Sequence, residues 1–253
     1  MARFVLEVMY DGTCFHGSQI QGHTPTVQLA VNNMLGTLLR VPVLSYGASR
    51  TDEGVHALSN FYHFDHEEEL RPDFLYKCNA IIDSGIAVKN IYRAINPEFN
   101  ARFEAVQRSY RYRIYTAKNP FLVNKALFYP FPVSVHKLNE TAAIIREYTQ
   151  FESFAKRNAQ VKTFECRIHE SYWEQKDNEL HYVVAANRFL RGMVRGLVAT
   201  QLRLVRDGAP PQKLKEIIEA ANCTKAFFNV AGHGLYLETI AYPDGVMQLL
   251  QTQ

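Results

Sequence analysis

The sequence predicts an α+β protein built from two tandem βαββαβ units. Segments in which apolar residues alternate, as strands require, are separated by segments whose apolar residues recur at helical spacing. Their order is strand, helix, strand, strand, helix, strand, and the same order then recurs. A sheet needs cover on one face, so each unit would keep its other face free for a ligand.

The first unit is expected to start with a strand over residues 3–10, where apolar side chains alternate. Thr24 and Pro25 supply a cap and a first-turn proline for a helix. The apolar residues of that helix recur at its spacing: Val27, Val31, Met34, Leu35 and Leu38. Strands at 43–48 and 57–65, a short helix over 71–78 and a strand at 86–95 follow.

The second unit is expected to start with a long strand over residues 106–116. Ser134 caps the next helix, and the strands 164–173 and 180–186 form a hairpin around Asp177 and Asn178. A long helix then buries Leu190, Val194, Leu197, Val198 and Val205 and ends before Gly208. One more helix follows Pro211, and residues 235–241 form the last strand.

This order is that of the ferredoxin-like motif, twice over. We expect an N-terminal half of residues 1–103 and a C-terminal half of residues 104–253. Their mainly antiparallel sheets would flank a central active-site cleft, with helices on the opposite face.

Composition narrows the class of protein. The chain has 253 residues, a net charge of +3 and 47% hydrophobic residues, as ordinary soluble globular proteins do. It has no apolar run long enough for a membrane span, and its four cysteines form no C-x-x-C pair. We therefore expect a cytoplasmic protein with reduced thiols and no membrane contact. It also has no Gly-rich phosphate loop, so no nucleotide cofactor is implied.

The most informative stretch is residues 47–57, GASRTDEGVHA. Arg50 and Asp52 are two residues apart, so in extended backbone they project to the same side. A guanidinium beside a carboxylate favours the ionised carboxylate, which can act as a nucleophile or stabilise charge. The alternative is a turn with a surface ion pair.

A second stretch, residues 108–115, reads RSYRYRIY. Strand alternation places Arg108, Tyr110 and Tyr112 on one face, and Arg111, Arg113 and Tyr115 on the other. An aromatic ring flanked by guanidinium groups suits a nucleobase and its phosphate. The alternative is a cross-strand aromatic ladder with solvated arginines.

A third stretch, residues 187–195, reads NRFLRGMVR. On a helix, Arg188, Arg191 and Arg195 would form one basic stripe opposite the apolar one. The alternative is a solvated helix face.

These stretches resemble motifs of the TruA family of tRNA pseudouridine synthases. Residues 49–57 resemble its G-R-T-D-x-G-V-H-A signature, Arg108 and Tyr110 its R-x-Y-x-Y strand, and residues 193–196 its M-V-R-N/G. Residues 10–12 and Gly17 look like the start of its Y-D-G-x-x-x-x-G-W-Q opening, with Ser18 in place of the tryptophan. Residues 234–237 resemble its closing G-L-Y-L, whereas residues 79–83 depart from its N-A-x-L-P.

The resemblance implies an enzyme that isomerises uridine to pseudouridine in the tRNA anticodon stem–loop, at positions 38–40, as a homodimer without cofactor or metal. Asp52 would be the nucleophile, kept ionised by Arg50 and Arg195. Tyr110 would support the flipped uracil, with Leu235 packed near the base. Arg108, Arg188 and Arg191 would line the tRNA-binding cleft.

Alternatives from other classes remain open at this stage. A non-catalytic RNA-binding module could use the same sheets and the Tyr110 face. A nucleoside hydrolase or glycosidase could also use an aspartate on a sugar, although most need a second carboxylate and Glu53 points away. His63 and His66 could be metal ligands, but on a strand this spacing puts them on opposite faces.

Overall fold

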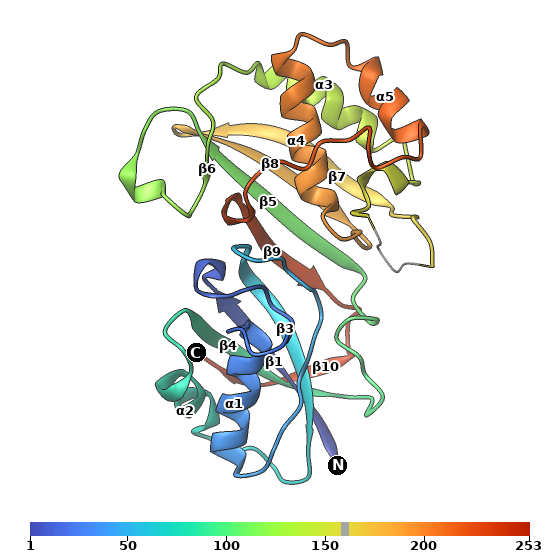
Figure 1. Cartoon of the computed structure of the whole chain (residues 1–253). Coiled ribbons are helices and arrows are strands. Elements are labelled where there is room, and N and C mark those ends of the chain that lie inside the picture. The colour runs from blue at the N-terminus through green and yellow to red at the C-terminus, as the bar shows by residue number, and fades with distance from the viewer. Residues whose placement is uncertain (158–161) are drawn as a thin grey trace. The chain divides into compact units, whose positions relative to one another are not determined.

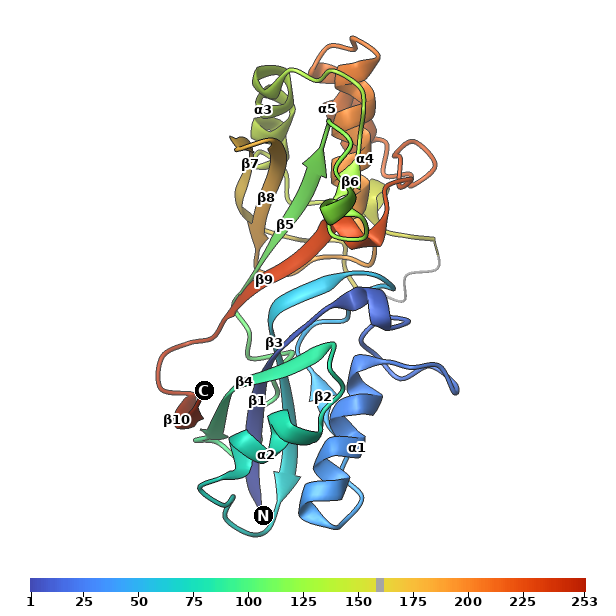
Figure 2. The same ribbon diagram turned by 90° about the vertical axis from the view of Figure 1, so that its left-hand side faces the viewer.

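The structure, a computed structural model, describes residues 1–157 and 162–253 (Figures 1 and 2). The chain forms two compact units. The first comprises Met1–Val106 together with Leu237–Gln253, and the second comprises Gln107–Tyr236. This differs from the expected halves 1–103 and 104–253, because the C-terminal segment returns to the first unit. There β10 (Met247–Thr252), a strand that the sequence did not predict, pairs antiparallel with β4 (Ile86–Ala94).

An antiparallel sheet forms the centre of the first unit. β1 (Ala2–Tyr10) lies between β3 (His56–His66) and β4, which gives the order β10-β4-β1-β3. α1 (Val27–Leu39) and α2 (Phe74–Ile81) lie on one face of this sheet (Figure 1). Phe4, Leu6 and Val8 of β1 are fully buried. The strands predicted over residues 3–10, 57–65 and 86–95 are thus confirmed.

The residue that caps the start of α1 differs from the predicted one. Thr26, not Thr24, is the N-cap, and its side-chain oxygen accepts the N–H of Leu29 at 3.3 Å. The hydroxyl of Thr24 instead donates to the carbonyl of Gln21 at 2.8 Å. Thr24 therefore stabilises the loop before the helix, and the helix begins at Val27 after a residue in extended conformation.

The strand predicted over residues 43–48 shrinks to β2 (Tyr46–Gly47), which pairs with β3. Side chains of α1 explain the loss. The N–H of Ser45 donates to Asn32 Oδ1 at 2.9 Å, and the carbonyl of Ser45 accepts from Gln28 Nε2 at 2.6 Å. The helix thus satisfies the main-chain groups that a longer ladder would have used.

Strands that pair mainly antiparallel also form the centre of the other unit. β5 (Gln107–Tyr115) and β7 (Ile168–Lys176) both pair with β8 (Glu179–Ala186), and β6 (Leu127–Phe128) runs parallel to β5. The predicted hairpin is confirmed: β7 and β8 join through Asp177 and Asn178, with Asp177 in the left-handed region at φ 53°.

β7 begins at Ile168 and not at residue 164, because other partners take up the preceding main chain. The N–H of Cys166 donates to the carbonyl of Thr149 at 2.8 Å, and that of Arg167 donates to Asn187 Oδ1 at 2.8 Å.

The helices of the second unit are α3 (Val135–Ile145), α4 (Met193–Arg206) and α5 (Gln212–Glu219). Ser134 caps α3 as predicted. Gln201 of α4 is fully buried and accepts from the indole N–H of Trp173 on β7 at 2.9 Å, which fastens the helix to the sheet. None of the helices within the described ranges is both long and apolar enough to cross a membrane.

The remaining elements are short or link the units. β9 (Leu235–Ala241) matches the predicted last strand, and it passes from the second unit into the first after Tyr236. Single-turn 3₁₀ helices lie at Gly12–Cys14, Pro120–Leu122, Glu152–Phe154 and Gly232–Gly234.

His63 on β3 is a buried titratable group of the first unit. Its Nδ1 accepts the N–H of Ala101 at 3.3 Å, and its ring stacks on Tyr46 with 5.4 Å between centroids. Burial and the nearby charge of Arg3 lower the pKa of His63 to about 4, against the opposing effect of Asp65. The folded protein therefore holds this ring neutral.

This environment predicts a pH dependence of stability. Between about pH 6.5, the ordinary pKa of histidine, and about 4, the unfolded chain binds a proton that folded His63 does not. The free energy of unfolding should therefore fall as the pH is lowered through this window. In urea titrations at a series of pH values, His63→Gln should flatten the fall. His136→Gln, at a side chain 84% exposed on α3, should leave it unchanged. Equal slopes in parent and His63→Gln would contradict the assignment.

Candidate active site

The loop that carries Asp52 links β2 to β3 in the first unit. Its side chains alternate: Thr51 is buried, Arg50 is exposed and Asp52 is partly exposed. A tight turn follows, in which the N–H of Val55 donates to the carbonyl of Asp52 at 3.2 Å and Gly54 has φ +76°. Arg50 and Asp52 therefore lie on a short loop that leaves both side chains in contact with solvent.

Buried polar groups anchor this loop from beneath. The hydroxyl groups of Tyr10 and Thr51 are hydrogen-bonded at 2.9 Å. The side-chain amide of Asn60 donates to the Tyr10 hydroxyl at 3.2 Å and to the carbonyl of Ser49 at 3.0 Å. Burial raises the pKa of Tyr10 to about 12, although its hydrogen bonds act against the rise, so the phenol stays neutral. The backbone on both sides of Arg50 is thus held in place.

Gly12 and Gly17 pack directly against the loop that carries Asp52. A Cβ atom at Gly12 would lie 2.0 Å from the carbonyl oxygen of Val55. At Gly17, where φ is +92°, it would lie 2.9 Å from the carbonyl oxygen of Thr51. The N–H of Gly12 also donates to Nδ1 of buried His56 at 3.2 Å. The approach of two backbones requires glycine here.

The aromatic candidate lies in the second unit. Tyr110 of β5 is 8% exposed, and its ring meets that of Phe189 edge to face, with centroids 5.2 Å apart. Arg108 is also buried, and its Nη1 donates to the carbonyl of Asn187 at 2.8 Å. Arg108 thus fixes the start of the loop that carries Phe189.

Tyr112, predicted on the same face as Tyr110, has a different environment. It is fully buried, and its hydroxyl donates to the carbonyl of Ala231 at 2.7 Å. A Cβ atom at Gly234 would lie 2.6 Å from its ring. Tyr112 therefore fixes the segment that leads into β9, where Leu235 is 6% exposed.

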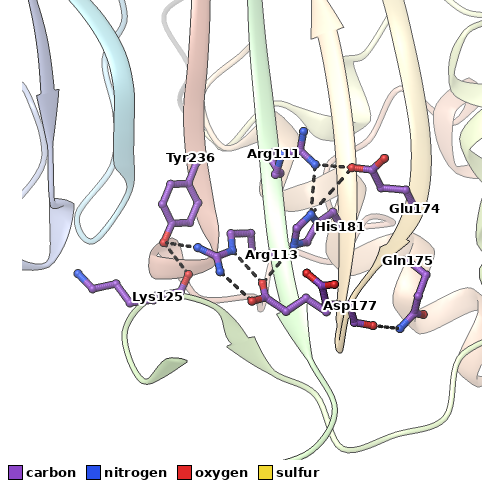
Figure 3. Close-up of polar contacts among 9 residues, drawn as sticks. Arg111, Arg113, Lys125, Glu174, Gln175, Asp177, His181 and Tyr236 are labelled. Carbon is purple, nitrogen blue, oxygen red and sulfur yellow. Dashed lines mark hydrogen bonds and ion pairs between the residues drawn. The ribbon is translucent and has the colours of Figure 1, made fainter. Parts of the chain in front are cut away.

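The other face of β5 carries a chain of polar contacts (Figure 3). Arg113 binds both carboxylate oxygens of Glu179 at 2.8 Å, and Arg111 pairs with Glu174. His181 links the pairs, with Nδ1 at 3.1 Å from Arg111 Nη1 and Nε2 at 3.1 Å from Glu179. The predicted separation of Arg111 and Arg113 from Tyr112 is confirmed, and both arginines are neutralised by carboxylates.

The basic stripe predicted on one helix is wrong. Gly192 has φ +76° and is the N-cap of α4, so the helix begins at Met193. Arg188 and Arg191 precede it in a loop, whereas Arg195 lies in its first turn. The helical spacing of the apolar residues continues through Gly192, so it did not reveal that the left-handed conformation of this glycine starts the helix only at Met193. Arg195 donates from Nε and Nη2 to the carbonyl of Val230 at 3.0 and 2.7 Å.

Relatives decide what kind of protein this is. The chain is 37% identical over 249 residues to tRNA pseudouridine synthase A of Parabacteroides distasonis, covering 96% of this chain and 97% of the relative. It is 36% identical to the protein of the same name from Bacteroides thetaiotaomicron, covering 97% and 93%, and 30% identical to that of Staphylococcus saprophyticus, covering 94% and 90%. The family model described as tRNA pseudouridine synthase matches residues 149–243.

The chain belongs to the tRNA pseudouridine synthase family. It is therefore an RNA pseudouridine synthase, an isomerase, and the resemblance drawn from its motifs is confirmed. A non-catalytic RNA-binding module is no longer a candidate.

For this pseudouridine synthase, the structure brings Arg50 and Asp52 together in one loop of the first unit. Tyr110, Arg108 and Leu235, together with Arg188, Arg191 and Arg195, belong to the second unit. The pairing of Arg195 with Asp52 stays a prediction. Among residues 1–157 and 162–253, no group of histidine, cysteine and acidic side chains is arranged to hold a metal ion.

Sequence reasoning missed the residues that hold the loop of the synthase. Asn60 lies in a strand where polar and apolar residues are about equally frequent, so the sequence offers no clear signal that its amide is buried and hydrogen-bonded. Tyr10 and Gly12 were noted as part of a motif, but their contact with a loop some forty residues away is a tertiary feature.

The close approach at Gly12 yields a test with a built-in control. In Gly12→Ala the added methyl group meets backbone, so the Asp52 loop must move; we expect a loss of about 1–3 kcal/mol in the free energy of unfolding and a lower isomerase rate. Gly36→Ala, inside α1 with 3.5 Å to its nearest neighbour, should gain about 0.5–1 kcal/mol and keep the rate. Thermal unfolding and single-turnover assays report both. Parent-like behaviour of Gly12→Ala would refute the packing.

Proposed function

We propose that this enzyme acts on tRNA, converting uridine to pseudouridine at positions 38–40 of the anticodon stem–loop with Asp52 as nucleophile and without a cofactor. Its full-length relatives are named tRNA pseudouridine synthase A, which supports tRNA as the substrate. The observation that carries the role of Asp52 is its position: a partly exposed carboxylate on a loop whose neighbouring residue, Thr51, is anchored by buried hydrogen bonds.

The proposed chemistry is balanced without an outside reagent. The bond from N1 of uracil to C1′ of ribose breaks, the base rotates, and a bond from C5 to C1′ forms. The C5 proton is lost and N1 gains one, so atoms and electrons are conserved. The carboxylate of Asp52 would form the transient bond, to the sugar or to the base.

The neighbouring groups take supporting roles in this proposal. Arg50, in the same loop, would stabilise the charge of Asp52, and Arg195 would do so from the second unit. Tyr110 would support the uracil once it is flipped out of the stem, since a stacked base is out of reach. Its edge-to-face contact with Phe189 keeps the ring in a defined orientation. Leu235, almost fully buried, would pack near the base.

Arg188 and Arg191 would contact phosphates of the RNA. They lie in the loop before α4, where Arg191 is exposed and its carbonyl accepts the N–H of Lys156 at 3.0 Å. In the same proposal Arg108 would line the tRNA-binding cleft, and its hydrogen bond to the carbonyl of Asn187 holds the start of this loop. Basic groups on a loop that is already held in place lose less conformational freedom when they bind a polyanion.

We also infer two ferredoxin-like units, a homodimer and a cytoplasmic location. In the first unit β2 pairs with β3 beyond β1, so the order β4-β1-β3-β2 supports the βαββαβ arrangement. In the second unit the order β5-β8-β7, with helices after β5 and β8, supports it as well. The homodimer and the location rest on the family resemblance.

Asp52→Asn tests the nucleophile. The amide keeps the shape but cannot attack, so the rate of pseudouridine formation should fall by at least about a thousandfold, while folding and tRNA affinity stay nearly unchanged. Glu53→Gln, which neutralises the neighbouring exposed carboxylate, is the matched control and should keep the parent rate. The measurement is carbodiimide mapping of pseudouridine in tRNA. Turnover of Asp52→Asn within about tenfold of the parent would sink the assignment, and release of free uracil would indicate a glycosidase.

Salt titration separates phosphate contacts from the groups around Asp52. Arg191→Ala should weaken binding of all tRNAs alike and flatten the log–log salt slope by about one unit. Arg195→Ala should lower the single-turnover rate with little change in slope, because its partner in this proposal is Asp52.

Arg146→Ala removes the same charge from the exposed end of α3 and is the control; it should change neither quantity. An altered slope with an unchanged rate in Arg195→Ala would return that residue to phosphate contact.

A further inference from the structure

Ser18 lies in the loop before α1 and is 3% exposed. Its hydroxyl accepts the N–H of Thr51 at 2.8 Å, and its own N–H donates to the carbonyl of Thr51 at 3.0 Å. Its carbonyl accepts the N–H of Gln28, in the first turn of α1, at 3.0 Å. Ser18 thus ties both main-chain polar groups of the residue before Asp52 to the start of a helix.

The surroundings of Ser18 leave little freedom to this contact. Its hydroxyl acts on the phenols of Tyr10 and Tyr62, where it opposes the rise in pKa that burial causes. Beside it, Gly17 passes so close to the carbonyl of Thr51 that a Cβ atom would lie 2.9 Å away. The chain therefore packs backbone against backbone here, with the Ser18 hydroxyl filling the polar gap.

The hydroxyl matters because the N–H of Thr51 is buried. A buried donor without an acceptor is costly, so the loop would shift to find another partner if the oxygen were absent. Asp52 is the next residue along the chain, and a displacement of about 1 Å at a reacting group can cost about a hundredfold in rate. Loss of the Ser18 hydroxyl would therefore shift Thr51 and, with it, the carboxylate of the next residue, Asp52.

We propose that Ser18 is a positioning residue for the isomerisation: its hydroxyl holds Thr51 and so sets the place and direction of the Asp52 carboxylate. This rests on the proposed role of Asp52 as nucleophile. Ser18 itself would touch neither the uridine nor the RNA, because it lies beneath the loop. Its loss should therefore affect the chemical step and not the binding of tRNA.

The test compares Ser18→Ala and Ser18→Cys with Ser45→Ala. Cysteine keeps the branching of serine and fills the space left empty in the alanine variant, but its sulfur is larger and is a weak acceptor. Ser45 is a fully buried serine of the same unit whose hydroxyl donates to Asn32, so its loss controls for general destabilisation. The readouts are the single-turnover rate at saturating tRNA, the Kd for tRNA, and hydrogen exchange of the peptide that contains Thr51.

Both Ser18 variants should react about ten- to a hundredfold more slowly. Their Kd for tRNA should stay within about twofold, and their Thr51 amide should exchange at least about tenfold faster. Ser45→Ala should keep the parent rate and the parent protection of that amide. A parent-like rate in Ser18→Ala or Ser18→Cys would overturn the proposal, as would a loss explained by weaker tRNA binding.

Hydrogen exchange also separates this inference from the proposed function. Should the parent enzyme form no pseudouridine in tRNA, the proposed function fails. The proposed positioning role then fails with it, while the contact itself is judged by exchange alone. Equal protection of the Thr51 amide in parent and Ser18→Ala would show that the hydroxyl does not hold the loop.

Discussion

The hydrogen bonds beneath Thr51 are the contacts on which the candidate active site depends. Tyr10 and Ser18 engage the side chain and the main chain of this residue, and Asn60 joins Tyr10 to Ser49. A single such bond contributes only about 1 kcal/mol, but leaving a buried group unpaired costs about 1–3 kcal/mol. Few other arrangements of these buried groups therefore lie close in energy. The loop above it is held in one shape while Arg50 and Asp52 remain accessible.

This arrangement suits the reaction proposed above, in which Asp52 acts without a cofactor. In that proposal the rate would come from placing the Asp52 carboxylate correctly before the substrate arrives. The glycines next to the loop serve the same end, because Gly12 and Gly17 let backbone pack against backbone. Because buried and exposed residues alternate along this loop, Thr51 is held from beneath while Arg50 and Asp52 stay accessible to solvent.

The second unit uses polar side chains in a comparable way. Arg108, Tyr112 and Arg195 each bond a backbone carbonyl, and so hold the segments around Phe189 and Leu235. On the other sheet face, Arg111 and Arg113 are paired with glutamates (Figure 3). The net charge of +3 therefore says little about where positive charge lies. Some arginines are paired with carboxylates within the fold, and others lie on the loop before α4. Position, more than total charge, decides which of them can meet a polyanion.

The sequence by itself determined the family and most of the elements, because motifs and periodicity are local. The strands β1, β3, β4, β5 and β9, the hairpin around Asp177 and the cap of α3 all follow from residues close in the chain. Tertiary structure decided the rest. β2 is short because Asn32 and Gln28 hydrogen-bond the main chain of Ser45, the residue before it. β10 forms by pairing with β4, a strand far from it in the sequence. Likewise, Ser18 gained its role from Thr51, and Asn60 gained its role from Tyr10 and Ser49. These partners are distant in sequence or lie across a turn, and no local pattern records such contacts.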